Sequence, residues 1–122
     1  MNLKKLFNKK QQQKTREIPV TFYSDGLKLN GKVLFPEKAS SGAEVPGVVF
    51  CHGFGASIKA VESSARILTK KGLATFMFDF RGHGNSEGVL DDKFPNDAIA
   101  AYNTFKEFPG VDKNRIGIVG HS

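Results

Sequence analysis

The chain has 122 residues, of which 39% are hydrophobic and 25% are charged, and these values predict a single soluble globular domain. No apolar stretch reaches the length of about 18 residues that a membrane-spanning helix needs. The formal net charge is +6, but residues 1–16 contain six basic residues and no acidic one. Removing these six leaves twelve basic residues against twelve acidic ones, so the rest of the chain is electrically balanced and does not indicate a nucleic-acid partner.

A basic tail is predicted over residues 1–17, ahead of a folded domain over residues 18–122. Leu3, Leu6 and Phe7 share one face of a helix among lysines, and one interpretation is an amphipathic segment that contacts an anionic membrane surface. The other interpretation is a solvated chain terminus. Lysines interrupt the apolar stretch of a secretory signal peptide, and a single cysteine forms no internal disulfide, so a cytoplasmic protein is expected.

The folded domain is expected to begin with a hairpin. Residues 18–23 and 27–35 alternate apolar and polar side chains, which is the pattern of half-buried strands. The segment Ser24–Gly26 separates them, and an Asp-Gly pair in this position indicates a tight turn because both residues tolerate positive φ. Residues 36–46 are expected to form a surface loop, since they are rich in Ser, Gly, Glu and Pro.

Three later segments, residues 48–51, 74–78 and 116–119, are almost continuously apolar. This pattern is typical of strands that are covered on both faces, as in parallel sheets with helices above and below. The chain between the first two segments predicts a helix, because apolar residues recur there every three or four positions and a glycine follows. The residues concerned are Ile58, Val61, Ala65 and Leu68, with Gly72 as the stop.

A second helix is predicted from Asn96 to Phe108. Its expected inner face consists of Ala98, Ala101, Tyr102, Phe105 and Phe108. Strands that alternate with helices of this length predict an α/β fold, with an antiparallel entry hairpin followed by parallel strands and with helices on both faces of the sheet.

The candidate chemistry lies at the carboxyl ends of the three apolar strands, the edge where open α/β sheets bind ligands. One strand ends in His52-Gly53-Phe54-Gly55, the next runs into residues 79–88, and the third ends in Gly120-His121-Ser122. The last segment matches the first half of Gly-x-Ser-x-Gly, whose sharp turn presents a serine hydroxyl above the sheet. The glycines beside Phe54 allow a backbone N–H to face a reacting carbonyl.

These segments together resemble the α/β-hydrolase fold over residues 18–122, most of all its serine aminopeptidase-like and monoacylglycerol lipase-like branch. Dienelactone hydrolase-like and prolyl oligopeptidase-like relatives are nearby. Residues 52–55 are similar to the family's oxyanion loop, residues 78–88 to the loop after its fourth strand, and residues 111–122 to its fifth strand and nucleophile elbow. The resemblance implies a serine hydrolase that cleaves a small-molecule ester or a short peptide through an acyl-enzyme, with no metal or organic cofactor.

The resemblance assigns Ser122 as the nucleophile and the backbone N–H of Phe54 as one oxyanion donor. His121 occupies the variable position of the elbow and is expected to pack rather than to catalyse. The family's catalytic acid and histidine follow the serine, and its sheet has eight strands, of which this chain supplies five. We therefore expect a domain truncated after its fifth strand, with an exposed apolar edge, poor folding and no activity of its own.

Asp79, Arg81 and His83 lie near the predicted site and are expected to order their loop. Asp79 and Arg81 are expected to bond backbone groups or each other. An alternative role for His83 is that of a substitute base for Ser122, because its loop lies at the active end of the sheet.

Two other classes of function remain as alternatives. One is a non-catalytic binding module with the same fold. The other is a dinucleotide-binding domain, because Gly53-Phe54-Gly55 follows a strand and Asp79 ends the next strand, where a ribose-binding acid would lie. Ile58 opposes this second alternative, since it occupies the third glycine position of the motif. No metal-ligand spacing is present, and Cys51 is expected to be a buried strand residue rather than a reactive thiol.

Overall fold

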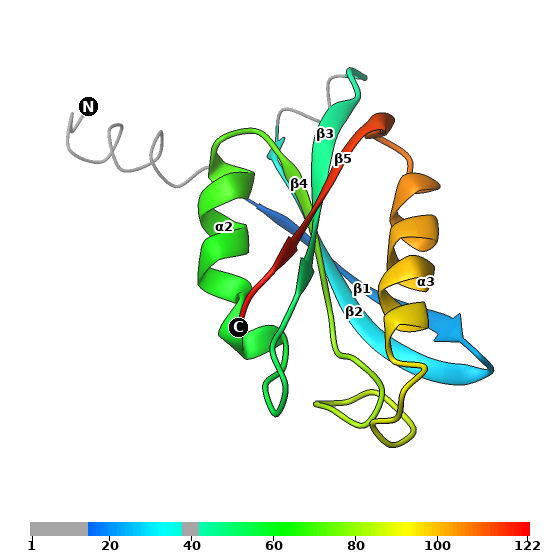
Figure 1. The fold of residues 1–122 in the computed structure, drawn as a ribbon. Helices are drawn as coiled ribbons and strands as arrows, with labels where there is room; N and C mark the ends of the chain where they lie inside the picture. The colour runs from blue at the N-terminus through cyan, green and yellow to red at the C-terminus, as the bar shows by residue number, and fades with distance from the viewer. Residues whose placement is uncertain (1–14, 38–41) are drawn as a thin grey trace.

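The computed structural model describes residues 15–37 and 42–122, and these form a five-stranded sheet in the order β1-β2-β4-β3-β5. Figure 1 shows the sheet edge-on between two helices. The elements in chain order are β1 (Arg16–Ser24), β2 (Leu27–Phe35), β3 (Val45–Cys51), η2 (Ile58–Ala60), α2 (Glu62–Lys70), β4 (Ala74–Phe78), α3 (Pro95–Lys106) and β5 (Val111–Gly120). Most of the predicted tail lies outside the described residues, and β1 begins two residues before the predicted strand.

The strand pairing confirms an antiparallel entry hairpin followed by parallel strands. β1 and β2 are antiparallel, and their turn has positive φ at Asp25 (50°) and Gly26 (79°), as the Asp-Gly pair predicted. β2 is antiparallel to β4, whereas β3 is parallel to both β4 and β5. Cys51 pairs with Phe78 on one side and with Gly120 on the other, so the three parallel strands end at the same edge.

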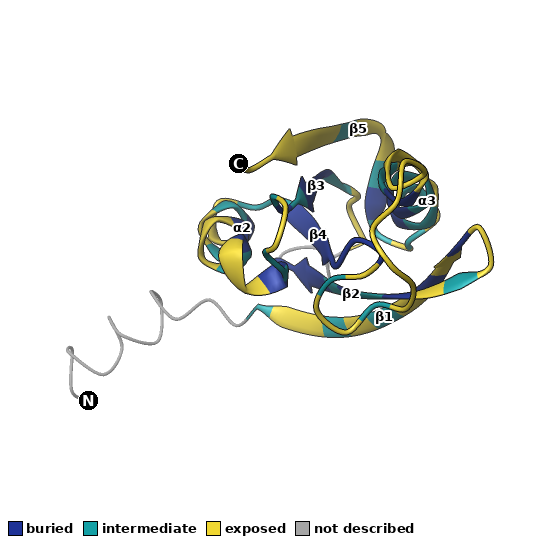
Figure 2. Cartoon of the chain, turned by 60° about the horizontal axis from the view of Figure 1, so that its bottom comes forward, coloured by how far each residue is buried: buried dark blue, intermediate teal, exposed yellow. Residues whose placement is uncertain are grey.

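The helices lie on opposite faces of the sheet, and each covers its own apolar cluster. Val48 and Phe50 of β3 join the cluster under α2, whereas Val49 joins the cluster under α3. Figure 2 shows β3 and β4 buried between the two helices. A strand that buries both faces places an apolar side chain at every position, and full burial of such a side chain contributes about 1.5–3 kcal/mol. This explains the continuous apolar segments of the sequence.

β5 differs from the two central strands because it forms the edge of the sheet. Its described partner is β3, and Ile118 and Val119 expose 55% and 42% of their surface. Figure 2 shows this strand as mostly exposed. The expected exposed apolar edge is therefore confirmed. The apolar segment at 116–119 also predicted a strand buried on both faces, and β5 is not buried in this way.

The first predicted helix is interrupted. Ser57 accepts a hydrogen bond from the Lys59 N–H through its Oγ at 3.3 Å, and the short helix η2 precedes α2. Ile58, Val61 and Ala65 are buried under these two elements, as the spacing predicted. Gly72 follows with a φ of 101°, which favours glycine and ends the helix.

The second predicted helix begins one residue earlier and ends two residues earlier than expected. Ala101 and Phe105 are buried, as predicted. The prediction that Tyr102 lies on the inner face is wrong, because Tyr102 is only half-buried. The Lys106 Nζ lies 5.8 Å from the centroid of its ring. Asp97 takes an inner position instead. None of the helices in the described ranges has the length and apolar character needed to cross a membrane.

Candidate active site

The turn after β3, the loop after β4 and the two residues that follow β5 meet at one end of the sheet, the lower end in Figure 1. The His121 N–H donates a hydrogen bond to the Cys51 carbonyl oxygen at 2.9 Å, which joins the end of β5 to the end of β3. A cavity of about 340 Å³ opens between these three segments. It is lined by Cys51, His52, Gly53, Phe54, Phe80, His83, Leu90, Phe94, Gly120, His121 and Ser122.

The backbone of His121 and Ser122 lies directly against the turn after β3. A Cβ atom added to Gly53 would lie 2.9 Å from the His121 carbonyl oxygen and 3.4 Å from the Ser122 Cα. Only glycine permits this approach, because a real Cβ does not come within 3 Å of a backbone atom. The structure thus brings Ser122 and Phe54 to one cavity. His121 is exposed and lines the same cavity, and its expected packing role stays a prediction.

Phe54 occupies the second position of a four-residue turn. The Ala56 N–H donates to the Gly53 carbonyl oxygen at 3.1 Å, and Gly55 has a φ of 76°, which together define a type II turn. No group in the described ranges accepts a hydrogen bond from the Phe54 N–H. The Phe54 ring is 87% exposed. The backbone N–H that the resemblance singled out therefore has no hydrogen-bond partner among the described residues.

His52 links the turn after β3 to the loop after β4. Its Nδ1–H donates to the Gly53 carbonyl oxygen at 2.8 Å, and its Nε2 accepts from the Phe80 N–H at 3.0 Å. Burial lowers the pKa of His52 below its usual value of 6.5, and the neighbouring His83 ring, 5.0 Å away between centroids, adds to this effect. The imidazole is neutral and serves the backbone. The sequence offered no signal for this role beyond the position of His52 before a glycine.

His83 makes the second link between these loops. The Gly55 N–H donates to His83 Nε2 at 2.9 Å, and His83 Nδ1–H donates to the Arg81 carbonyl oxygen at 3.0 Å. The ring also stands edge-on to Phe54, with 5.9 Å between centroids. Both ring nitrogens are used within the loops, which supports the expectation that His83 orders its loop rather than the alternative of a substitute base.

Asp79 orders its loop through backbone groups, as predicted. Its Oδ1 accepts from the Ile58 N–H at 2.9 Å, and its Oδ2 accepts from the Asn85 N–H at 3.1 Å and from Asn30 Nδ2 at 3.0 Å. A Cβ atom added to Gly84 would lie 2.4–2.6 Å from this carboxylate, so the loop closes tightly around it. Because both carboxylate oxygens are occupied, Asp79 does not offer the free acid that a ribose needs.

Arg81 does not bond Asp79, and this part of the prediction is wrong. Its guanidinium, 2% exposed, bonds the fully buried Asp97 through Nε at 3.1 Å and Nη2 at 2.8 Å. The Arg81 backbone N–H also donates to Asp97 at 2.9 Å. Asp25 accepts from Nη2 at 2.7 Å, and Asp91 accepts from Nη1 at 3.2 Å. These bonds, chiefly those to Asp97, raise the pKa of Arg81 and keep it charged.

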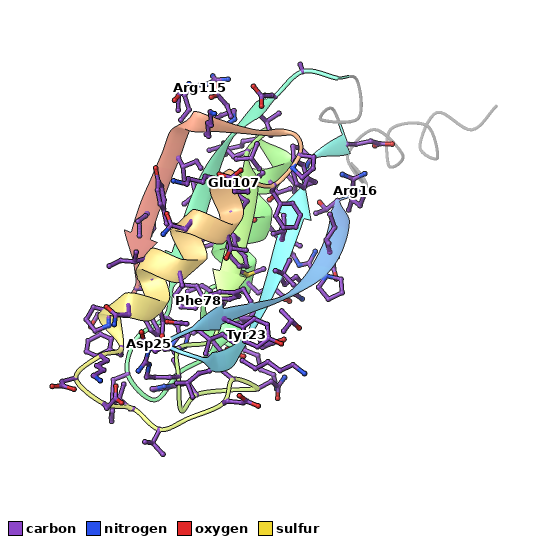
Figure 3. All side chains as sticks on the ribbon, turned by 90° about the vertical axis from the view of Figure 1, so that its right-hand side faces the viewer. Arg16, Tyr23, Asp25, Phe78, Glu107 and Arg115 are labelled. Carbon is purple, nitrogen blue, oxygen red and sulfur yellow. The ribbon has the colours of Figure 1, made fainter. Side chains whose placement is uncertain are left out.

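Sequence reasoning missed Asp97. Its spacing of four residues from Ala101, and of eight from Phe105, places it on the inner face of α3, and this was the available signal. Figure 3 shows Asp25 at the end of the molecule that carries the loop after β4, with Glu107 and Arg115 toward the other end. Asp25 accepts a side-chain hydrogen bond from Asn96 and another from the Arg81 guanidinium. Both bonds lower the pKa of Asp25.

Cys51 ends β3 and is half-buried. Burial raises the pKa of its thiol to about 11, so the sulfur is protonated at neutral pH, in agreement with the predicted strand role. In the part of the chain that the structure describes, no three His, Cys, Asp or Glu side chains are grouped to hold a metal ion.

The sheet order, the two covering helices and the similarity to solved structures define an α/β-hydrolase fold. The family model described as serine aminopeptidase, S33, matches residues 44–122. The chain belongs to this family, so the predicted resemblance is confirmed, and the hydrolase class is favoured over a dinucleotide-binding domain.

Individual relatives agree with this assignment. The chain is 35% identical over 104 residues to a protein named Thiohydrolase aneE from Aspergillus aculeatus, which covers 80% of this chain and 31% of that protein. It is similar in structure to a hypothetical protein from Pseudomonas aeruginosa (TM-score 0.80, 26% identity, 90% of this chain and 36% of the other). It is also similar to an esterase from Pyrococcus furiosus (TM-score 0.73, 27% identity, 90% and 41%). The chain spans about a third of the length of the curated relatives it matches.

Proposed function

We propose that the protein hydrolyses a carboxylic ester, thioester or amide through an acyl-enzyme on Ser122. The observation that carries the proposal is the shared cavity: Ser122 and Phe54 both line it, and Gly53 lies against the backbone of His121 and Ser122. Among the described residues, no group accepts a hydrogen bond from the Phe54 N–H. Acyl transfer requires a nucleophile and a backbone donor that stabilises the oxyanion, and the proposal assigns these roles to Ser122 and the Phe54 N–H.

The proposed reaction has two halves. Ser122 Oγ attacks the carbonyl carbon and loses its proton to a base, while the carbonyl π electrons move to the oxygen, where the Phe54 N–H stabilises the charge. The tetrahedral intermediate collapses, the bond to the leaving group breaks, and the leaving group departs with a proton. Water then attacks the acyl-serine by the same route and releases the acid. One such donor contributes about 10²–10³ in rate in comparable sites.

The reaction also needs a base that takes the proton of Ser122 and an acid that orients this base. The proposal assigns both groups to a segment that the longer relatives have and that this chain does not span. His52 and His83 support this assignment, because both already use their two ring nitrogens in bonds to backbone groups. We therefore expect the 122-residue chain alone to show no turnover of p-nitrophenyl acetate. Turnover that Ser122→Ala abolishes would contradict this expectation.

The cavity supports an uncharged, apolar substrate group. Among the described residues, its lining includes Phe54, Phe80, Leu90 and Phe94 and no Asp, Glu, Lys or Arg. A substrate with a free α-ammonium group would find no carboxylate there to pair with, and burying an unpaired charge is unfavourable. We therefore favour an ester with an apolar acyl group over a peptide with a free α-ammonium group. Because the chain is similar to a protein named as a thiohydrolase, thioesters should be assayed as well.

Labelling with a fluorophosphonate probe tests the proposal on the protein in its full length. We expect the wild type to be labelled, Ser122→Ala to be unlabelled, and Ser64→Ala, an exposed serine on α2, to be labelled as the wild type. An unlabelled, folded wild type would contradict the proposal and favour the non-catalytic binding module. If the probe labels the protein, its rates on two substrates test the substrate class. Faster cleavage of an amino-acid p-nitroanilide than of p-nitrophenyl hexanoate would contradict the apolar substrate class and leave the role of Ser122 intact.

A further inference from the structure

The turn after β3 is held at Phe54 by hydrogen bonds rather than by packing. The Phe54 side chain is almost fully exposed, and its described ring contact is with His83. A residue that is not packed keeps its backbone geometry only if neighbouring peptide groups are anchored. Two imidazoles, one from each of two loops, provide anchors on the two sides of Phe54.

The first peptide, between Gly53 and Phe54, is anchored through its carbonyl oxygen. That oxygen accepts from His52 Nδ1–H at 2.8 Å and from the Ala56 N–H at 3.1 Å. The N–H of the same peptide group points opposite to its carbonyl, because the peptide bond is planar and trans. These bonds therefore set the direction of the Phe54 N–H.

The second peptide, between Phe54 and Gly55, is anchored through its N–H by His83. Because a carbonyl oxygen only accepts, the 3.0 Å contact of His83 Nδ1 with the Arg81 oxygen places the ring proton on Nδ1. Nε2 then carries a lone pair and accepts from the Gly55 N–H at 2.9 Å. The φ and ψ of Phe54 are the two rotations between the anchored peptides, so neither is free.

We propose that His83 is a positioning residue of this site: it anchors the Phe54–Gly55 peptide and thereby keeps the Phe54 N–H in place for the oxyanion. The support extends into the core, because His83 is bonded to the Arg81 carbonyl, and the Arg81 side chain is locked by the buried Asp97. This inference rests on the proposed function, since the oxyanion forms only if Ser122 is the nucleophile.

Two amide variants of His83 separate this role from a merely structural one. His83→Gln places its side-chain oxygen near the position of Nε2 and can still accept from Gly55. His83→Asn places its amide near Nδ1, can still donate to the Arg81 carbonyl, and does not reach Gly55. Both variants lose the ring contacts with His52 and Phe54, so each serves as the control for the other.

The kinetic measurement uses the full-length protein and p-nitrophenyl hexanoate. We expect His83→Gln to keep kcat within about threefold of the wild type, and His83→Asn to lower kcat about tenfold with KM little changed, because the oxyanion exists in the transition state and not in the bound substrate. Equal losses in both variants, or a loss confined to KM, would overturn the inference. Loss of kcat in both, together with loss of a limb of the pH profile, would instead make His83 the base.

Amide hydrogen exchange at Gly55, measured by NMR, gives a readout that does not depend on activity. We expect exchange about tenfold faster in His83→Asn than in His83→Gln or the wild type, because only the Asn variant lacks the acceptor. Equal exchange in all three proteins would overturn the inference. If the wild type is not labelled by the fluorophosphonate, the proposed function fails, and equal or unequal exchange at Gly55 still decides whether His83 anchors the turn.

Discussion

The turn after β3 and the loop after β4 lie side by side at the same end of the sheet, but they use their polar groups in opposite ways. The loop after β4 contains Asp79, Arg81 and His83, and each of these side chains is bonded to protein groups. In the turn after β3, His52 is bonded to backbone groups, and no group in the described part of the chain accepts a hydrogen bond from the Phe54 N–H. The charged loop is thus the support, and under the proposed function the glycine-rich turn presents the backbone donor for the oxyanion. Charged residues near a site are not by themselves evidence of catalysis.

The largest effect is expected from breaking the support at the buried ion pair. Asp97→Ala leaves the buried Arg81 guanidinium without its main partner, and removing one member of a buried pair costs about 3–5 kcal/mol of unfolding free energy. Urea denaturation measures this loss. Asp91→Ala removes an exposed partner of the same guanidinium and serves as the control, with a much smaller loss expected. Equal losses in the two variants would contradict the assigned importance of Asp97.

An intermediate effect is expected where the turn after β3 contacts the turn of Ser122. Gly53→Ala places a Cβ 2.9 Å from the His121 oxygen, which pushes the two turns apart. Under the proposed function, kcat falls about 10- to 100-fold, because misplacing reacting groups by about 1 Å has that effect. Gly117→Ala in β5 is the matched control, since its Cβ meets nothing within 4 Å. If both variants keep wild-type kcat, the close approach has no part in positioning.

The smallest effect is expected from pH. The folded-state pKa of His52 is lowered by burial, so below pH 6.5 the unfolded chain binds a proton that the folded chain resists. The contribution of His52 to the free energy of unfolding is therefore complete above pH 6.5 and is lost as the pH falls from 6.5 toward the lowered value. Urea denaturation at pH 7.5, 6.5 and 5.5 measures it. His52→Asn retains a donor toward Gly53 and should show a smaller decline, and an unchanged decline would show that another group titrates.

Sequence reasoning succeeded where the signal was local. β4 spans the predicted residues 74–78, because a strand buried on both faces is almost continuously apolar, and its one polar side chain, Thr75, bonds the Thr69 hydroxyl. The hairpin turn followed from Asp25 and Gly26, whose positive φ depends on their own chemistry. The edges of α3 and the split before α2 were less accurate, because caps and short helical turns depend on individual hydrogen bonds such as that of Ser57.

The amino-acid sequence by itself determined the order of the elements, the common edge of the parallel strands and the three turns that meet there, since these follow from periodicity, turn chemistry and strand direction. Only the tertiary structure decided which groups pair within those turns. Arg81 bonds Asp97 across 16 residues of chain, and His83 accepts from Gly55 across 28 residues. A side chain chooses among several nearby donors and acceptors by distance and burial in the folded loops, and no local pattern records that choice.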